Sequence, residues 1–442
     1  MQLAKSFVLL SAVLATAVMA APYSQRSLEA RLLFGGSDNT TAAGLPSQDA
    51  FYQPPSGWES KANGAILRSR QVKPSSSNAA AAYQILFKTT DALGAADHTV
   101  TTILVPKKPQ SPSKIVSIQL PEDSASVDCA PSAAIVANSK SNFAGLIPFV
   151  NQGLEPSLQN GYYVNIPDHE GSRALVFVGP MEGHAVLDSL KAATSFPTAI
   201  PGVSIKTPIV MGGYSGGAHA TAWGSQLYPS YAPTLNIIGQ VIGGTPVNLT
   251  SVLNYLNKPS LASPVQVSWA SESISDQAVR VPSADDSKFL CSDYRYNAYP
   301  DIKEYIDASV YPNGTALIKD IQNNKCLAQV VFDYSGKDLF SLFTTQNPLD
   351  APVPRKRLNE NLLGSNGKTL KVKTIMYHSD KDDIIPYGDA KRYATEQCAK
   401  GASINFVTDS GQSHVGEELS RADDLGKWID AFHKGTADSS CK

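Results

Sequence analysis

The chain has 442 residues, of which 42% are hydrophobic and 17% charged, and its formal net charge is -2 at pH 7. This is the composition of a globular protein with ample material for a large core, in two or three domains or in one large domain with an insertion. The near-neutral charge, without a cluster of Lys or Arg, gives no electrostatic support for a nucleic-acid partner.

The N-terminus has the pattern of a secretory signal peptide. Lys5 supplies a positive charge, residues 7–19 form an apolar stretch too short to span a bilayer comfortably, and small residues precede a cleavage position after Ala20. We therefore expect residues 1–20 to be removed and the protein to be secreted and extracellular, without an integral membrane segment; an N-terminal anchor is the alternative. Residues 21–50 are polar and are predicted to be a flexible lead or a pro-segment.

From residue 82 onward, short apolar runs alternate with stretches of helical spacing, and the Pro- and Gly-rich segment before them is expected to wrap around the body. Strands are predicted at 82–90, 98–106, 114–120, 162–168, 207–212 and 235–244. Helices are predicted near 141–159, over 181–196 and from Ser215 or Gly216. This alternation indicates an α/β fold with a mostly parallel sheet and helices on both faces.

Residues 248–353 break this alternation, because they are rich in Tyr, Ser, Asp and Pro. We interpret them as a helical cap or lid, inserted into an α/β core made of residues 51–247 and 354–442. Helices are predicted in the insertion near 250–257, 301–308 and 315–323. The alternation then resumes, with strands at 370–380 and 404–409 and helices at 387–400 and 415–435.

The cysteines and the N-glycosylation sequons agree with secretion. The cysteines are Cys129, Cys291, Cys326, Cys398 and Cys441. In an oxidising compartment this number predicts two disulfides and one free thiol, without fixing the pairing. The sequons give candidate glycosylation sites at Asn39, Asn248 and Asn313. Neither CxxC nor HExxH occurs, so the sequence does not support a metal site, and no metal or other cofactor is expected.

Residues 213–217 spell G-x-S-x-G, between a predicted strand and a predicted helix. This setting is the nucleophile elbow of an α/β-hydrolase, in which the serine lies at a strained turn and the glycines let strand and helix approach closely. Such a turn lifts Ser215 Oγ to the sheet edge and points the N–H of Gly216 toward a forming oxyanion. An ordinary serine in a glycine-rich loop is the alternative.

An elbow serine requires an acid and then a histidine, in that order along the chain. His414 lies between the last strand and the last helix and is the predicted base, whereas His378 comes too early and His433 is expected on a solvated helix face. The acid is expected on the loop 378–386. That loop offers Asp380, Asp382 and Asp383, and position alone does not separate them.

Two other groups of polar residues are interpreted as structural. In the PDHEG block, Asp168, His169 and Glu170 are adjacent and cannot easily converge on one metal ion, so a structural role or a place at the pocket edge is favoured. His219 follows the elbow serine by four residues and is expected to pack beneath the site.

Four blocks of the sequence are together far more specific than G-x-S-x-G alone. They are EDSASVDCAPS (122–132), PDHEG (167–171), GYSGGAHATAW (213–223) and HSDKDDIIPY (378–387). In length and order they resemble the fungal secretory lipases of the Candida antarctica lipase A type, over nearly the whole mature chain. The resemblance implies an α/β-hydrolase with a triad of Ser215, Asp382 and His414 and an oxyanion hole at Asp123 and Gly216.

The resemblance also implies a pairing of the cysteines. The implied disulfides are Cys129–Cys326 and Cys398–Cys441, which leaves Cys291 unpaired. The chain departs from the family at Ser379, where Gly is frequent, and in the GQSHV approach to the histidine. Neither departure removes a reacting atom.

Together, these features predict a serine ester hydrolase that works through an acyl-enzyme without a cofactor. We expect a triacylglycerol lipase, with a lipid or ester substrate presented at an oil–water interface, that functions as a monomer. A secreted carboxylesterase that removes short acyl groups from a soluble metabolite is the alternative. A non-catalytic binding protein with this fold would have lost a triad member, and all three candidates are present.

Overall fold

The computed structural model describes residues 44–441 without 148–152, 258–298, 323–324, 335–337, 339, 366 and 368. The predicted signal peptide, Asn39 and Cys291 lie outside the described residues. In the described ranges, no helix combines the length and the hydropathy that crossing a bilayer requires.

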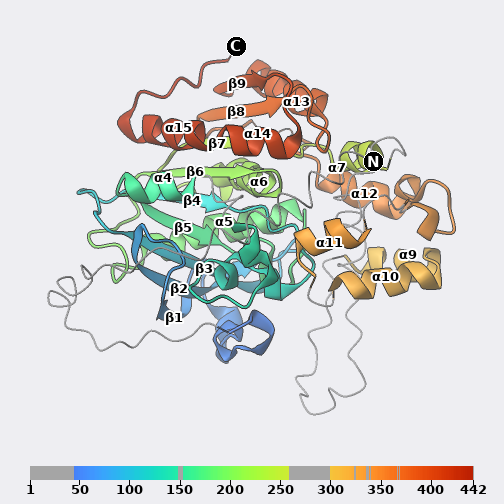
Figure 1. The fold of residues 1–442 in the computed structure, drawn as a ribbon, viewed down its shortest axis with the longest axis horizontal. Coiled ribbons are helices and arrows are strands. Elements are labelled where there is room, and N and C mark those ends of the chain that lie inside the picture. The colour runs from blue at the N-terminus through green and yellow to red at the C-terminus, as the bar shows by residue number, and fades with distance from the viewer. Residues whose placement is uncertain are drawn as a thin grey trace, which may run out of the picture. The chain divides into compact units, whose positions relative to one another are not determined.

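A single sheet of nine strands runs through the described part of the chain, in the order β1-β2-β3-β5-β4-β6-β7-β8-β9 (Figure 1). The strands are β1 (Ile66–Val72), β2 (Ala79–Thr90), β3 (Ala96–Pro106), β4 (Ile115–Gln119), β5 (Tyr163–Pro167), β6 (Ile209–Tyr214), β7 (Ile237–Gly243), β8 (Thr374–Ser379) and β9 (Ile404–Asp409). The pairs β1–β2, β2–β3 and β3–β5 are antiparallel, and all pairs from β5 to β9 are parallel. The predicted α/β fold with a mostly parallel sheet is confirmed.

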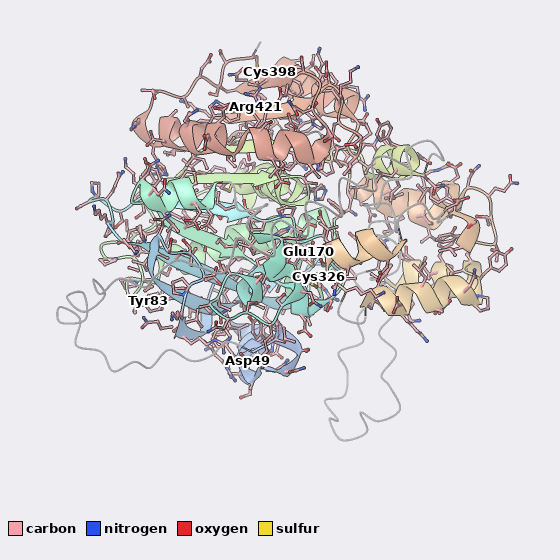
Figure 2. All side chains as sticks on the ribbon, viewed as in Figure 1. Asp49, Tyr83, Glu170, Cys326, Cys398 and Arg421 are labelled. Carbon is pink, nitrogen blue, oxygen red and sulfur yellow. A yellow bond between two sulfur atoms is a disulfide. The ribbon has the colours of Figure 1, made fainter. Side chains whose placement is uncertain are left out.

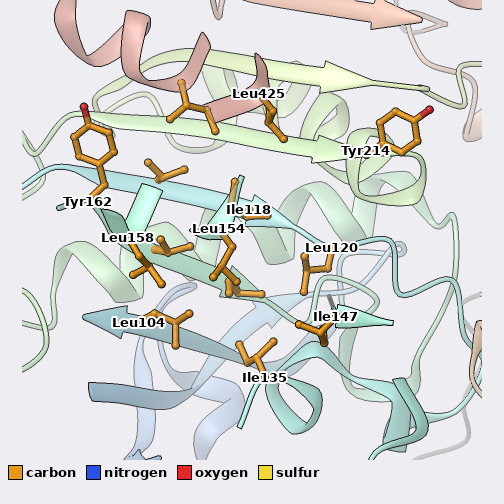
Figure 3. Packing of buried hydrophobic residues seen from close by; sticks show 14 of the residues in the cluster. Leu104, Ile118, Leu120, Ile135, Ile147, Leu154, Leu158, Tyr162, Tyr214 and Leu425 are labelled. Atoms are coloured by element: carbon orange, nitrogen blue, oxygen red, sulfur yellow. The ribbon is translucent and has the colours of Figure 1, made fainter. Parts of the chain in front are cut away.

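Helices cover both faces of the sheet. One face is covered by α5 (Gly179–Thr194), α6 (Gly216–Tyr231) and α13 (Tyr387–Ala399), and the other by α4 (Leu154–Gln159) and α15 (Ala422–Lys434). Strand β8 shows the alternation that this requires, because Ile375 and Tyr377 pack on the α15 side while Met376 packs on the α13 side. Figure 3 shows the α15 side, where Leu425 and Leu154 lie over Ile118 of β4.

A group of helices lies in the predicted insertion and runs past its predicted end at residue 353, to the right in Figure 1. It comprises α7 (Leu249–Leu256), α9 (Pro300–Ser309), α10 (Pro312–Gln322), α11 (Leu327–Tyr334) and α12 (Pro352–Glu360), of which α11 and α12 were not predicted. These helices share an apolar core with Phe177, Ile384 and Ile385. Residues 384 and 385 follow β8, so the helical segment packs against a loop at the carboxyl edge of the parallel strands.

Two predicted helices are wrong in extent. The helix near 141–159 is a 3-10 turn at Asn142–Gly145 and the separate α4, because Pro156 lacks a backbone donor and fits only the first turn of a helix. The helix over 415–435 is α14 (His414–Ser420) followed by α15, and the chain turns at Arg421, whose guanidinium binds Asp409 and Asp424.

The N-terminal part of the described chain packs on the body rather than hanging free. Ser47, within the predicted lead segment, binds the Asp128 carboxylate through its backbone N–H (2.8 Å) and its hydroxyl (2.7 Å). Asp49 forms an ion pair of 2.6 Å with Arg70. Strand β1 was not predicted either, because six of its seven residues are half-buried or exposed, in no clean alternation.

Two glycosylation sequons lie in described helices. Asn313 is exposed in the first turn of α10. Asn248 is the N-cap of α7, and its Oδ1 accepts a hydrogen bond of 3.2 Å from the N–H of Ser251. A glycan is attached through Nδ2, so this cap is compatible with modification, and glycosylation at both positions stays a prediction.

The disulfides join Cys129 to Cys326 and Cys398 to Cys441, the pairs that the resemblance implies. Figure 2 labels Cys326 and Cys398. The first bond links the loop after β4 to the start of α11, across 197 residues of sequence, and the second ties the chain end to α13 across 43 residues. The first therefore anchors the helical segment to the sheet.

Opening the first disulfide is expected to destabilise the protein more than opening the second. The longer closure restricts the unfolded chain more, so Cys129→Ser/Cys326→Ser should cost about 1 kcal/mol more than Cys398→Ser/Cys441→Ser in the chain-entropy model. Denaturant unfolding of the two double variants measures the difference, under non-reducing conditions that keep the remaining disulfide closed. Equal or reversed losses would contradict this prediction.

Candidate active site

Ser215 occupies a strained turn between β6 and α6. Its backbone angles are φ 52° and ψ -123°, a conformation that residues other than glycine rarely adopt. The turn is tight, because a Cβ on Gly213 would lie 2.4 Å from Gly217 O, and one on Gly217 would lie 1.9 Å from Gln119 O. The glycines of the motif are thus required by the close approach of β6, α6 and β4.

His414 lies within hydrogen-bond distance of Ser215. His414 Nε2 is 2.9 Å from Ser215 Oγ, and both residues are 5% exposed. His414 begins α14, whose N-cap Ser413 accepts a hydrogen bond from the N–H of Gly416. The helix start and the N–H of His414, which donates to Asp383 Oδ1 at 2.9 Å, fix the position of the ring.

Among the three aspartates of the loop after β8, Asp382 is the one that reaches the histidine. Its Oδ2 is 2.7 Å from His414 Nδ1, and its Oδ1 accepts from the N–H groups of Ile384 (2.8 Å) and Ile385 (2.7 Å). Asp383 accepts from the backbone of His414, and Asp380 accepts from the N–H of Gly411. The structure therefore brings Ser215, His414 and Asp382 together in the predicted order.

The electrostatics of this group favour an ionised acid and a basic histidine. Burial alone would raise the pKa of Asp382, but the imidazole of His414 and a hydrogen bond from His378 hold it well below its usual range. Burial alone would lower the pKa of His414, but the Asp382 carboxylate outweighs it, and the pKa of His414 is raised.

Asp123 lies over the N-terminus of α6. It follows β4, has a φ of 40°, and its Oδ1 would be 2.0 Å from a Cβ on Gly216. The first N–H groups of α6 have no partner within the helix, so the N–H of Gly216 is oriented for an oxyanion. Burial, followed by the nearby Glu182, raises the pKa of Asp123 to about 7 against the opposing effect of His414.

Glu418, one helical turn after His414, was not singled out by the sequence. It is 7% exposed, and its Oε1 has no hydrogen-bond partner among the described residues. Burial raises the pKa of Glu418 to about 8; His414 lowers it and Asp123 raises it further. A neutral glutamic acid thus lies beside the histidine and the oxyanion pocket. The i, i+4 spacing from His414 was the only signal for it in the sequence.

Glu418→Gln is expected to stabilise the protein at alkaline pH. The carboxyl has an ordinary pKa of 4.5 and a folded pKa of about 8, so the folded state loses stability as the pH rises between these values. Glutamine does not ionise, so the variant should gain up to about 5 kcal/mol over the parent at pH 8 and almost nothing at pH 4.

Thermal unfolding at both pH values tests this prediction, with Glu396→Gln as the control. Glu396 lies on α13 with its side chain 58% exposed, so its replacement should change the midpoint little at either pH. A Glu418→Gln variant whose advantage over the parent does not grow with pH would contradict the neutral state of Glu418.

Asp168 of the PDHEG block and His219 are buried and hydrogen-bonded to other residues of the fold. Asp168 accepts from the backbone N–H of Ser132 at 2.8 Å and from its hydroxyl at 2.5 Å. His219 Nδ1 is 2.7 Å from Glu182 Oε2, while Trp223 Nε1 donates to His219 Nε2 at 3.1 Å. These contacts agree with the structural roles predicted for Asp168 and His219, which stay predictions. Among the described residues, no group of three or more His, Cys, Asp and Glu side chains is arranged to hold a metal ion.

Of the two other C-terminal histidines, His433 differs from its predicted setting, whereas His378 does not. His433 is half-buried, with its ring 4.5 Å from that of Tyr162, and burial lowers its pKa to about 4, so the expectation of a solvated position is wrong. His378 is fully buried at the end of β8, and its Nε2 is 3.1 Å from Asp382 Oδ2.

The family model of the secretory lipases matches residues 142–275 and 295–440. The chain belongs to the secretory lipase family. This secretory lipase is 33% identical to Lipase A from Moesziomyces aphidis, over 94% of this chain and 84% of that one. It is also 33% identical to the secreted triacylglycerol lipase LIP1 of Malassezia furfur, over 88% of this chain and 75% of that one.

Solved structures show the same relation. The structure of Candida antarctica lipase A in its closed state aligns with this secretory lipase at a TM-score of 0.79 and 32% identity, over 90% of this chain and 88% of that one. The rice cell wall degrading esterase LipA of Xanthomonas oryzae aligns at a TM-score of 0.62 with 13% identity, which shows a shared fold only.

Proposed function

We propose that this chain is a secreted triacylglycerol lipase in which Ser215 is the nucleophile, His414 the general base and Asp382 the residue that orients the base. The observation that carries the proposal is the connected hydrogen bonding from Ser215 Oγ to His414 Nε2 (2.9 Å) and from His414 Nδ1 to Asp382 Oδ2 (2.7 Å). Relatives from Malassezia furfur and Malassezia restricta are named secreted triacylglycerol lipases, which supplies the substrate class and agrees with secretion.

The reaction follows from the positions of these atoms. As Ser215 Oγ bonds to the ester carbonyl carbon, His414 Nε2 takes its proton, and the carbonyl oxygen becomes an oxyanion. His414 then returns the proton to the departing alcohol, which leaves an acyl-enzyme. Water attacks the acyl-enzyme with His414 again as base, and the bond from the acyl carbon to Ser215 Oγ breaks as Oγ takes that proton back from His414, which releases the fatty acid. Asp382 stays ionised throughout, because its pKa is lowered.

Gly216 and Asp123 are proposed to hold the oxyanion. Gly216 offers a backbone N–H at the start of α6. Asp123 offers its own backbone N–H and, when protonated, a carboxyl O–H, since only the protonated form of a carboxyl can donate. The pKa of about 7 that burial gives Asp123 makes this form accessible near neutral pH.

The helical segment is proposed to cover the acyl group of the substrate. The hydroxyl of Tyr255 on α7 donates a hydrogen bond of 3.2 Å to the backbone carbonyl of Asp382, which places this helix beside the acid. The segment shares its apolar core with Ile384 and Ile385, the residues whose N–H groups bind Asp382. An apolar environment thus continues from the helices to the triad, as a fatty acyl chain requires.

A comparison of two substrates tests the substrate class. The purified protein is assayed on emulsified long-chain triglyceride and on p-nitrophenyl acetate, each beside Ser215→Ala. A lipase releases fatty acid from the emulsion, and Ser215→Ala abolishes both activities. Activity on the acetate ester alone would overturn the lipase assignment in favour of a carboxylesterase, and equal activity in the variant would overturn the mechanism.

A further inference from the structure

His378 shares the acid of the triad with His414. Its Nε2 is 3.1 Å from Asp382 Oδ2, the same oxygen that lies 2.7 Å from His414 Nδ1. His378 is the fifth residue of β8, is fully buried, and comes four residues before Asp382. Two imidazoles therefore meet on one carboxylate oxygen, one from β8, which precedes Asp382, and one from the start of α14.

The protonation of His378 Nε2 follows from what it faces. The neighbours within hydrogen-bond range are Asp382 Oδ2 and, at 3.2 Å, the backbone carbonyl of Ile385. Both are acceptors, so Nε2 carries a proton whether the ring is neutral or cationic. The Nε2–H is thus shared, in either charge state, between the Ile385 carbonyl and Asp382 Oδ2.

This donor completes the coordination of the carboxylate. Oδ1 of Asp382 accepts from the N–H groups of Ile384 and Ile385, and Oδ2 accepts from the two imidazoles. A carboxylate has about four acceptor positions, so none is left for water. Each donor also draws negative charge from the carboxylate, which weakens its attraction for the imidazolium of His414.

We propose that His378 is a positioning residue of the triad, which donates its Nε2–H to Asp382 Oδ2, fixes the plane of the acid and limits the basicity that Asp382 confers on His414. The proposal rests on the proposed function, because it assigns His414 as the base. With His378 present, His414 loses its proton at a lower pH and the enzyme stays active further into the acid range.

Several other titratable groups face the histidine and contribute to the same pH dependence. They are Asp382 after β8, Asp123 after β4, Tyr214 of β6, and Glu417 and Glu418 of α14. All of them stay in place when His378 alone is replaced. The charge of His378 also acts on Glu417. Because Gln, Asn and Leu are all uncharged, the difference between His378→Gln and the other two variants reports the donor to Asp382.

The test compares three variants on a soluble p-nitrophenyl ester across pH. His378→Gln keeps an N–H near the position of Nε2, whereas His378→Asn is too short to reach Oδ2 and His378→Leu has no donor. We expect kcat/KM to fall about 10- to 100-fold in His378→Leu and His378→Asn, the size of a buried hydrogen bond to a charge. We expect their acid limb to move to higher pH by about half a unit or more, and His378→Gln to restore both.

The outcomes separate this inference from its premise. If the acid limb stays in place in both His378→Leu and His378→Asn, then His378 only fills space and the inference is wrong. The same holds if His378→Gln is no better than His378→Leu. If His378→Leu does not fold, the comparison of His378→Asn with His378→Gln decides alone. If Ser215→Ala retains activity, the proposed function itself fails, whatever the His378 variants show.

Discussion

Replacing Ser215 with alanine is expected to lower kcat on ester substrates by a factor of about 10⁴ to 10⁶. The alanine variant keeps the oxyanion pocket and the binding surface but has no oxygen to form an acyl-enzyme, and His414 then has no proton to accept. Because the side chain is small and the strain lies in the backbone of the turn, the fold should be retained. Steady-state kinetics together with circular dichroism measure both effects.

The matched control is Ser230→Ala on the same helix. Ser230 is exposed near the C-terminal end of α6, and its hydroxyl donates to the carbonyl of Leu227 at 3.2 Å, far from the elbow at the other end of the helix, so its loss should leave kcat within about twofold. A Ser215→Ala variant that keeps more than a hundredth of the parent activity would show that another group attacks the ester. Loss of activity in Ser230→Ala as well would point to a folding defect.

The sequence was sufficient for all strands of the sheet except β1 and for two residues of the proposed triad. Continuous apolar runs predict parallel strands buried on both faces, and β4 and β5 are such runs, with every residue buried. Ser215 was recognisable because its motif lies between a strand and a helix. His414 was recognisable because a loop after the last strand places it at the carboxyl edge, beside the serine.

The acid could not be chosen from position, since three aspartates lie within four residues of the same loop. The choice depends on which carboxylate is turned inward by the N–H groups of Ile384 and Ile385, a detail of loop geometry that no periodicity encodes. The resemblance to a family supplied Asp382 instead. The same geometry explains why His378 was set aside: its role depends on a loop that folds back on its own strand.

The edge strand of the sheet and the burial of individual carboxyls could not be predicted from the sequence either. Strand β1 lies at the edge of the sheet and is only partly covered, so it lacks an apolar run. The sequence does not distinguish a buried glutamate such as Glu418 from an exposed one, because burial depends on how the chain packs. These are tertiary effects that override local pattern.

Replacing Gly216 with alanine is expected to lower kcat about 10²- to 10³-fold, the cost of losing one oxyanion donor. A Cβ at this position would lie 2.0 Å from Asp123 Oδ1 and 2.9 Å from its Cγ, so the buried carboxyl must move away from the start of α6. Alanine is otherwise favourable in a helix, so the thermal midpoint should change much less than the rate. Kinetics on a soluble ester and thermal unfolding measure the two effects.

Gly212→Ala provides the matched control. Gly212 lies in β6, three residues before Ser215. Its Cβ would meet Ile118 Cδ1 and Val241 O at 3.5 Å, which is ordinary contact, so activity should stay near that of the parent. If Gly216→Ala were as active as Gly212→Ala, Asp123 would not border the position of the oxyanion. If Gly216→Ala lost activity with KM unchanged, the lost interaction would be one made only in the transition state, which is where an oxyanion exists.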